Sequence, residues 1–122
     1  MTYESLYRDF LDFLPEKSEE IKNCMAKADV DPDEGMHIVF GEVIVPLMMR
    51  WAKEKDPVAL KAFGFIETMA MCNDKLISEV LDFTILESFA DQKPEVYAAI
   101  KEQLGPNTKE RCKTIEEYIL QS

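Results

Sequence analysis

Three aspartates at alternate positions are the first residues in this chain whose types and spacing could do chemistry. Asp29, Asp31 and Asp33 have the spacing that opens an EF-hand loop, in which carboxylate oxygens bind Ca²⁺. Such a loop also needs glycine at its sixth position and glutamate at its twelfth. Counted from Asp29, these two positions hold Glu34 and Phe40. The sequence therefore predicts an acidic, solvated loop here and no metal site.

The single histidine of the chain, His37, is the next candidate. It follows Glu34 by three residues, the spacing of the Glu-x-x-His pairs in di-iron helix bundles. Those sites require two such pairs and two further glutamates, which one histidine cannot supply in a monomer. His37 also has no serine or cysteine in a recognisable nucleophile motif beside it. We predict that His37 pairs with Glu34 at a helix start, and we expect no catalytic residue and no cofactor.

Four glutamates are of interest because apolar residues flank each of them: Glu42, Glu67, Glu79 and Glu87. A carboxylate in apolar surroundings has a raised pKa and can act as an acid or base, or receive a basic side chain from a partner. Glu42 is the foremost of the four, since nearly all its neighbours in the sequence are apolar. One hypothesis places Glu42, with Glu79 or Glu87, in a pocket between helices that binds a small ligand or catalyses a reaction. Glu67 and Glu79 also fit the polar side of their helices, and Glu87 could bond a capping group.

Acidic side chains outnumber basic ones, most strongly near the N-terminus. The chain has 24 acidic and 14 basic residues, a net charge of −10. Residues 1–34 contribute ten acids and four bases, a net charge of −6. This charge opposes binding to nucleic acid or to anionic lipid, and it speeds association with a basic protein.

The favoured hypothesis is therefore a non-catalytic interaction module that binds a basic protein partner. The candidate contacts are the acidic loop and one inner-face carboxylate: Asp29, Asp31, Asp33, Glu34 and Glu42. A further alternative is a homodimer that buries a stripe of methionine and phenylalanine side chains.

Apolar residues recur at steps of three and four along the whole sequence, which predicts one all-α domain over residues 1–122 with about seven helices. Residues 38–45 are rich in β-branched side chains, so a buried strand is the alternative there. Because helical spacing continues as far as Trp51, we favour a buried helix kinked at Pro46. At the other end of the chain, Thr108 is the predicted N-cap of the last helix.

The chain also echoes itself at an offset of 37 residues. Pro57 aligns with Pro94, and each proline lies between a long and a shorter predicted helix. The sequence thus predicts the same order of elements twice: a long helix, a loop that opens with proline, and a second helix. This order is typical of antiparallel helix pairs, stacked either as a short HEAT-like array or as an irregular bundle.

The cellular setting follows from what the sequence lacks. Its start has no basic region followed by an apolar run, and no stretch reaches the ~18 apolar residues that span a bilayer. The cysteines, Cys24, Cys72 and Cys112, are odd in number and widely separated, so neither a disulfide framework nor a zinc site is expected. We expect a cytoplasmic protein with reduced thiols.

Four segments carry a resemblance to a known family. They are His37–Val43 with Pro46, Phe65-Ile66-Glu67-x-Met69, Thr84-Ile85-Leu86-Glu87 and Gly105-Pro106-x-Thr108. Together they resemble a family of small bacterial proteins of unknown function, mostly from Gram-positive species. The resemblance implies no activity. In acidity, size and helix content the chain is also similar to immunity proteins that neutralise bacterial toxins.

Overall fold

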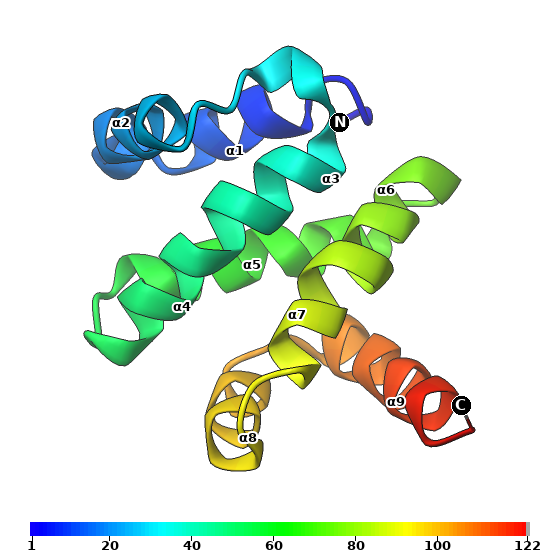
Figure 1. The fold of residues 1–122 in the computed structure, drawn as a ribbon. Helices are drawn as coiled ribbons and strands as arrows, with labels where there is room; N and C mark the ends of the chain where they lie inside the picture. Colours follow the sequence, from blue (N-terminus) through cyan, green and yellow to red (C-terminus); the bar gives the residue numbers. More distant parts are fainter. Residues whose placement is uncertain (122) are drawn as a thin grey trace.

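The computed structural model describes residues 1–121 and shows them as a bundle of helices (Figure 1). The α-helices are α1 (Leu6–Phe13), α2 (Ser18–Ala28), α3 (Met36–Val39), α4 (Val45–Lys53), α5 (Val58–Met71), α6 (Lys75–Glu79), α7 (Glu87–Ala90), α8 (Pro94–Glu102) and α9 (Pro106–Gln121). Between them lie two 3₁₀ turns, η1 (Pro15–Lys17) and η2 (Pro32–Glu34), and two π-helical segments, η3 (Phe40–Ile44) and η4 (Val80–Leu86). The all-α class is confirmed, and the described residues contain no strand.

The segment for which a strand was the alternative is helical. α3, η3 and α4 follow one another without a break from Met36 to Lys53. The expected disturbance at Pro46 takes the form of a wider turn directly before it, in which the Val45 N–H donates to the carbonyl of Phe40 five residues back. Proline has no N–H to donate and its ring clashes with the preceding turn, which accounts for a change of hydrogen-bond pattern at this point.

The order of helices that the internal echo suggested occurs twice in the structure, whereas a repeat of antiparallel pairs stays a prediction. The first occurrence consists of the continuous helix α3–η3–α4 followed by α5, and the second of α6–η4–α7 followed by α8. Both long helices contain a π-helical segment, and η3 packs against η4. In Figure 1 these two helices cross the middle of the molecule, with α1 and α2 at one end and α8 and α9 at the other. A HEAT-like stacking of the pairs stays a prediction.

Aromatic rings join the N-terminal helices to the central ones. Phe10 of α1 meets Phe40 and Phe65 edge-on, with ring centroids 5.8 and 5.1 Å apart. One hydrophobic cluster of buried side chains extends from Leu6 to Ile115. Edge-to-face pairs of this kind stabilise a core beyond the area they bury. They fix α1, and with it the acidic N-terminal third, on the rest of the bundle.

The helix α5 has 14 residues, most of which are apolar. Within residues 1–121, no helix combines the length and the apolar character needed to cross a membrane.

Candidate functional site

The acidic loop folds into a defined turn at the C-terminal end of α2. Asp29 adopts the left-handed conformation with φ of 55°, and the Val30 N–H donates to the carbonyl of Met25 at 3.0 Å. The Asp29 N–H donates to the carbonyl of Ala26 at 3.1 Å. These two bonds make a Schellman motif, which ends the helix and brings the side chains of Met25 and Val30 into its accompanying apolar contact. The turn therefore buries Val30 and leaves the aspartates on either side in solvent.

This turn borders an open groove of about 400 Å³, which we call the acidic groove. Its apolar part is formed by Tyr7, Met25, Ala26, Val30 and Pro32. Its charged rim consists of three carboxylates and one amine: Asp29, Asp31, Glu34 and Lys22. The negative pole of the α2 macrodipole lies at the same end and adds to the attraction for cations.

The carboxylates of the acidic groove are not neutralised within the described chain. Asp31 accepts a hydrogen bond from the Asp33 N–H at 2.8 Å and so caps η2. Neither Asp29 nor Glu34 forms an ion pair with any described residue, and all three rim carboxylates are exposed. Burial raises the pKa of Tyr7, so its hydroxyl stays protonated. The groove can thus attract a cation but contains no evident nucleophile among its described lining residues.

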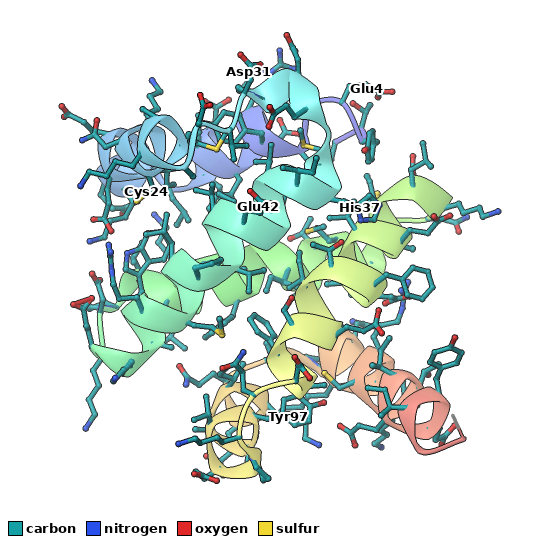
Figure 2. The ribbon with its side chains drawn as sticks, in the orientation of Figure 1. Glu4, Cys24, Asp31, His37, Glu42 and Tyr97 are labelled. Atoms are coloured by element: carbon teal, nitrogen blue, oxygen red, sulfur yellow. The ribbon has the colours of Figure 1, made fainter. Side chains whose placement is uncertain are left out.

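Of the five residues predicted to contact a partner, four lie at this turn and Glu42 does not. Asp33 is exposed beside the groove without lining it. Glu42 belongs to η3, further along the central helix (Figure 2), and is exposed although its sequence neighbours are apolar. The position of Glu42 at an inner face was therefore wrong. Helical geometry explains this, because Ile38, Glu42 and Pro46 share the outer edge of the helix while their neighbours point inward.

The other predicted pocket carboxylates, Glu79 and Glu87, are half-buried at different points of the second long helix. Glu87 lines an open cavity of about 520 Å³ together with Phe83, Asp91 and Ile119. Neither Glu42 nor Glu79 lines this cavity. The structure therefore does not bring the three glutamates together at this cavity.

His37 has a different neighbour from the one predicted. Its Nδ1 lies 2.5 Å from the hydroxyl oxygen of Thr84, on η4, and it makes no described contact with Glu34. The methyl group of the same threonine would lie 3.1 Å from a Cβ at Gly41. His37 thus helps to join the two long helices where their π-helical segments pack together. The sequence spacing suggested Glu34, three residues away, as the partner of His37, and it gave no sign of Thr84, which is 47 residues away.

Glu67 has a role that sequence reasoning missed. Its carboxylate accepts four hydrogen bonds at 2.8–3.0 Å, from the backbone and side chains of Asn107 and Thr108 in the first turn of α9. Burial of the carboxylate opposes its ionisation, but these bonds outweigh burial and lower the pKa of Glu67 to about 2. Thr108 was predicted as the N-cap of this helix, but α9 begins at Pro106, and its free N–H groups are capped by Glu67.

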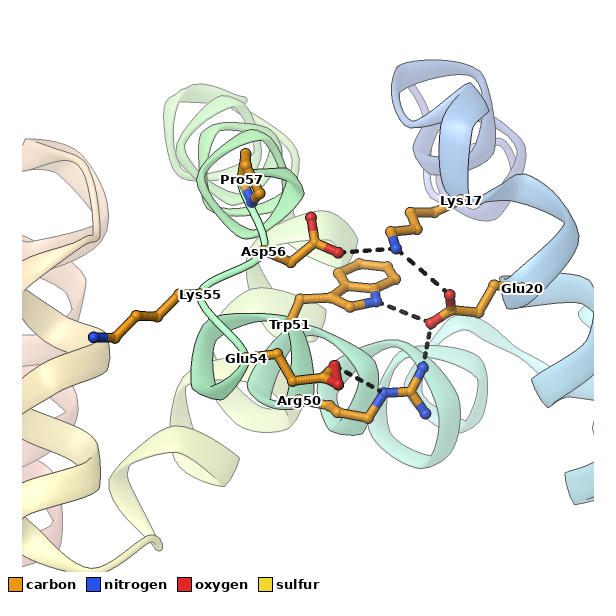
Figure 3. A pocket seen from close by; sticks show the side chains of 8 residues that line it. All are labelled: Lys17, Glu20, Arg50, Trp51, Glu54, Lys55, Asp56 and Pro57. Atoms are coloured by element: carbon orange, nitrogen blue, oxygen red, sulfur yellow. Dashed lines mark hydrogen bonds and ion pairs between the residues drawn. The ribbon is translucent and has the colours of Figure 1, made fainter.

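A second charged cavity, of about 520 Å³, is lined in part by the one tryptophan, Trp51 (Figure 3). Glu20 accepts a hydrogen bond from the Trp51 indole N–H at 3.0 Å and forms an ion pair with Arg50. Lys17 pairs with Asp56 at 2.9 Å and lies 3.6 Å from Glu20. The hydrogen bond from Trp51, with the nearby cations, lowers the pKa of Glu20.

The charges that line the tryptophan cavity balance, unlike those of the acidic groove. The lining of the tryptophan cavity includes three basic residues, Lys17, Arg50 and Lys55, and three acidic ones, Glu20, Glu54 and Asp56. Most of these groups already have partners within the chain. The cluster therefore ties α2 to α4 and the following loop, and the acidic groove is the stronger candidate for binding a charged partner. Among residues 1–121, no three His, Cys, Asp or Glu side chains are grouped so as to hold a metal ion.

Comparisons with known proteins place the chain in a family. A search of the curated proteins and a search of the solved structures found no match. The model of one family matches residues 7–119, which is nearly the whole sequence. The chain therefore belongs to the family described as a domain of unknown function, DUF7674.

Proposed function

We propose that this protein is a non-catalytic interaction module that binds a basic protein partner at the acidic groove. The observation that supports this is the charge of the groove: three carboxylates and one amine form the rim around an apolar floor. In the described chain, neither Asp29 nor Glu34 forms an ion pair that would neutralise this charge. An apolar floor with a charged rim is the usual arrangement of protein interfaces.

Charge beyond the groove supports the same proposal. Ten acids and four bases in residues 1–34 give the N-terminal third a net charge of −6, so a basic partner is attracted before contact. The accessible apolar surface of Tyr7, Ala26 and Pro32 would then contribute affinity that salt does not screen. A partner that inserts a lysine or arginine beside an apolar side chain fits both parts of the groove.

A narrower form of the proposal is toxin immunity, with a basic bacterial toxin as the partner. Its support is the acidic and all-helical character of the chain. A cytoplasmic location belongs to the same proposal. The toxin hypothesis is tested by whether the captured partner harms cells that lack this protein and spares cells that contain it.

The test of the general proposal is affinity capture from native lysate at low and high salt, comparing the wild type with two triple variants. The first, Asp29→Asn/Asp31→Asn/Glu34→Gln, neutralises the groove while keeping residues suited to the left-handed turn and to the cap. The matched control, Glu95→Gln/Glu102→Gln/Glu117→Gln, removes the same charge from exposed sites on α8 and α9.

The expected result is one basic protein retained by the wild type and by the control, released by salt, and lost with the groove variant. Equal retention by all three proteins would contradict the assignment of the groove. A retained partner that is acidic or a nucleic acid would contradict the proposed partner class.

A further inference from the structure

The helix α5 is apolar on nearly every side, yet one of its faces is uncovered. Lys61 and Glu67 are its only charged residues. Seven of its side chains are buried in the core: Val58, Ala59, Ala62, Phe63, Phe65, Ile66 and Met69. On the opposite face Leu60 is 61% exposed and Met71 is 68% exposed. Helices that are apolar all round are normally buried all round, so this face lacks a neighbour that its composition requires.

The uncovered face is a continuous stripe, which we call the α5 stripe: Pro57, Leu60, Gly64, Thr68 and Met71. All five residues are exposed and follow one another at steps of three and four, so they share one side of the helix. In Figure 1, α5 lies behind the two long helices, and the core side of α5 faces them. Phe13 of α1, which is 44% exposed, extends the stripe sideways, since Lys61 lies 5.9 Å from its ring centroid.

At Gly64, the centre of the stripe, packing among the described residues does not require glycine. A Cβ placed on it would meet no atom within 4 Å among the described residues. Glycine inside a helix lowers helix stability relative to alanine. Because Gly64 has no side chain, another helix can approach the α5 backbone closely at the centre of the stripe. Such a helix would have to come from a second molecule.

The α5 stripe itself contains no charged residue, and the two charged residues of α5 lie at its edges. Lys61, at one edge, pairs with Glu16 at 3.1 Å. Glu67, at the other edge, is held by the first turn of α9 through four hydrogen bonds. In a chain with a net charge of −10, two copies repel one another least where they meet on a surface without charged side chains. The α5 stripe is such a surface, which favours a second copy of this chain over a charged partner.

The stripe is also symmetric about its glycine. Leu60 and Thr68 lie four residues to either side of Gly64, and Pro57 and Met71 lie seven. When two such helices pack antiparallel about a two-fold axis at Gly64, Leu60 is level with Thr68 of the second copy. Met71 is then level with Pro57, so each large side chain meets a smaller one, and each of these pairs occurs twice, as in an isologous interface. We infer that the protein forms a homodimer through antiparallel packing of two α5 helices about Gly64.

The first experiment measures molar mass by light scattering and sedimentation velocity over a wide range of protein concentration. The wild type is expected to be a dimer that dissociates on dilution. Gly64→Glu places two like charges at the two-fold axis and is expected to be monomeric at every concentration. Because the site is open, the variant should fold normally, which its circular dichroism and Trp51 fluorescence will show. The control Phe83→Glu alters an apolar residue on η4 that is 57% exposed, and it is expected to leave the dimer intact.

A second experiment tests the register. Gly64→Cys, in a background with Cys24 and Cys72 changed to serine, is expected to form an intermolecular disulfide on mild oxidation, because a two-fold axis brings the two thiols together. Phe83→Cys in the same background should not. A wild type that is monomeric at every protein concentration overturns the inference, whether the α5 stripe then binds a different molecule or stays exposed. A dimer that survives Gly64→Glu overturns it as well, since the interface would then lie elsewhere.

Discussion

The carboxylate of Glu67 occupies the space that a side chain at residue 105 would need. A Cβ on Gly105 would lie 2.5 Å from the Cδ of Glu67, well inside contact distance. The absence of that side chain lets Glu67 of α5 reach the free N–H groups of Asn107 and Thr108, 40 and 41 residues further along the chain. Glycine at 105 thus makes possible a helix cap that is supplied by another helix.

Replacing Gly105 by alanine is therefore expected to destabilise the protein. The methyl group displaces Glu67 and leaves the first turn of α9 without its acceptor, at a cost of about 2 kcal/mol in the free energy of unfolding. Urea unfolding measures the change. The control is Gly64→Ala at a protein concentration low enough to give monomer, where the new methyl group meets nothing and helix propensity raises stability. Equal effects of the two substitutions would contradict the role of Gly105.

Acid is expected to weaken the same contact. The pKa of Glu67 is about 2 in the folded protein against 4.5 for an ordinary glutamate, so the folded state favours the ionised form. Its contribution to stability is complete above pH 4.5 and is lost as the pH falls toward 2. Glu67→Gln lacks this titration, so the stability advantage of the wild type over this variant should shrink across that range. Urea unfolding at a series of pH values checks this, and an advantage that does not change with pH would contradict it.

Replacing Lys55 by glycine is expected to stabilise the protein. Lys55 follows α4 in the left-handed conformation with φ of 58°, and the Lys55 and Asp56 N–H groups complete a Schellman motif on Ala52 and Trp51. A side chain with a Cβ is strained there, so Lys55→Gly should raise the free energy of unfolding by about 1 kcal/mol. Lys55→Ala removes the same charge but keeps the Cβ, and it should bring no such gain in thermal unfolding.

Removing the acceptor for the tryptophan is expected to loosen the contact between α2 and α4. Glu20→Ala leaves the indole N–H of Trp51 without its partner, and Arg50 without its ion pair to Glu20. The expected loss is about 1–2 kcal/mol in the free energy of unfolding, with a shift in the emission of the one tryptophan. Glu19→Ala removes the same charge from an exposed neighbour and should change neither quantity.

The three thiols should differ in their reaction with a thiol reagent. Cys24 and Cys72 are half-buried, whereas Cys112 is 1% exposed and burial raises the pKa of its thiol. We expect Cys24 and Cys72 to react in the native protein, and Cys112 only at the rate at which the protein unfolds. Titration with and without denaturant counts the thiols, and rapid reaction of all three in the native state would contradict the packing of α9 against α5 and η4.

Local sequence patterns predicted the helices well because their causes are local. Pro57 and Pro94 mark helix boundaries since proline has no N–H to donate, and the described structure has boundaries at both. The acidic turn was also found from its residues, although not the Schellman motif that gives it shape. The π-helical segments were not predicted, because a single extra residue in a turn leaves no clear mark on the spacing of apolar residues.

By itself, then, the sequence determined that this chain is all-helical, acidic and without a recognisable catalytic motif. Helical periodicity decides which residues share a face, and net charge depends on composition alone. Only the tertiary structure decided what each face meets: Glu42 lies outside, His37 meets Thr84, and Glu67 caps α9. Such contacts join residues about 40 or more positions apart, so they depend on how whole helices pack. The spacing of neighbours along the chain contains no record of that packing.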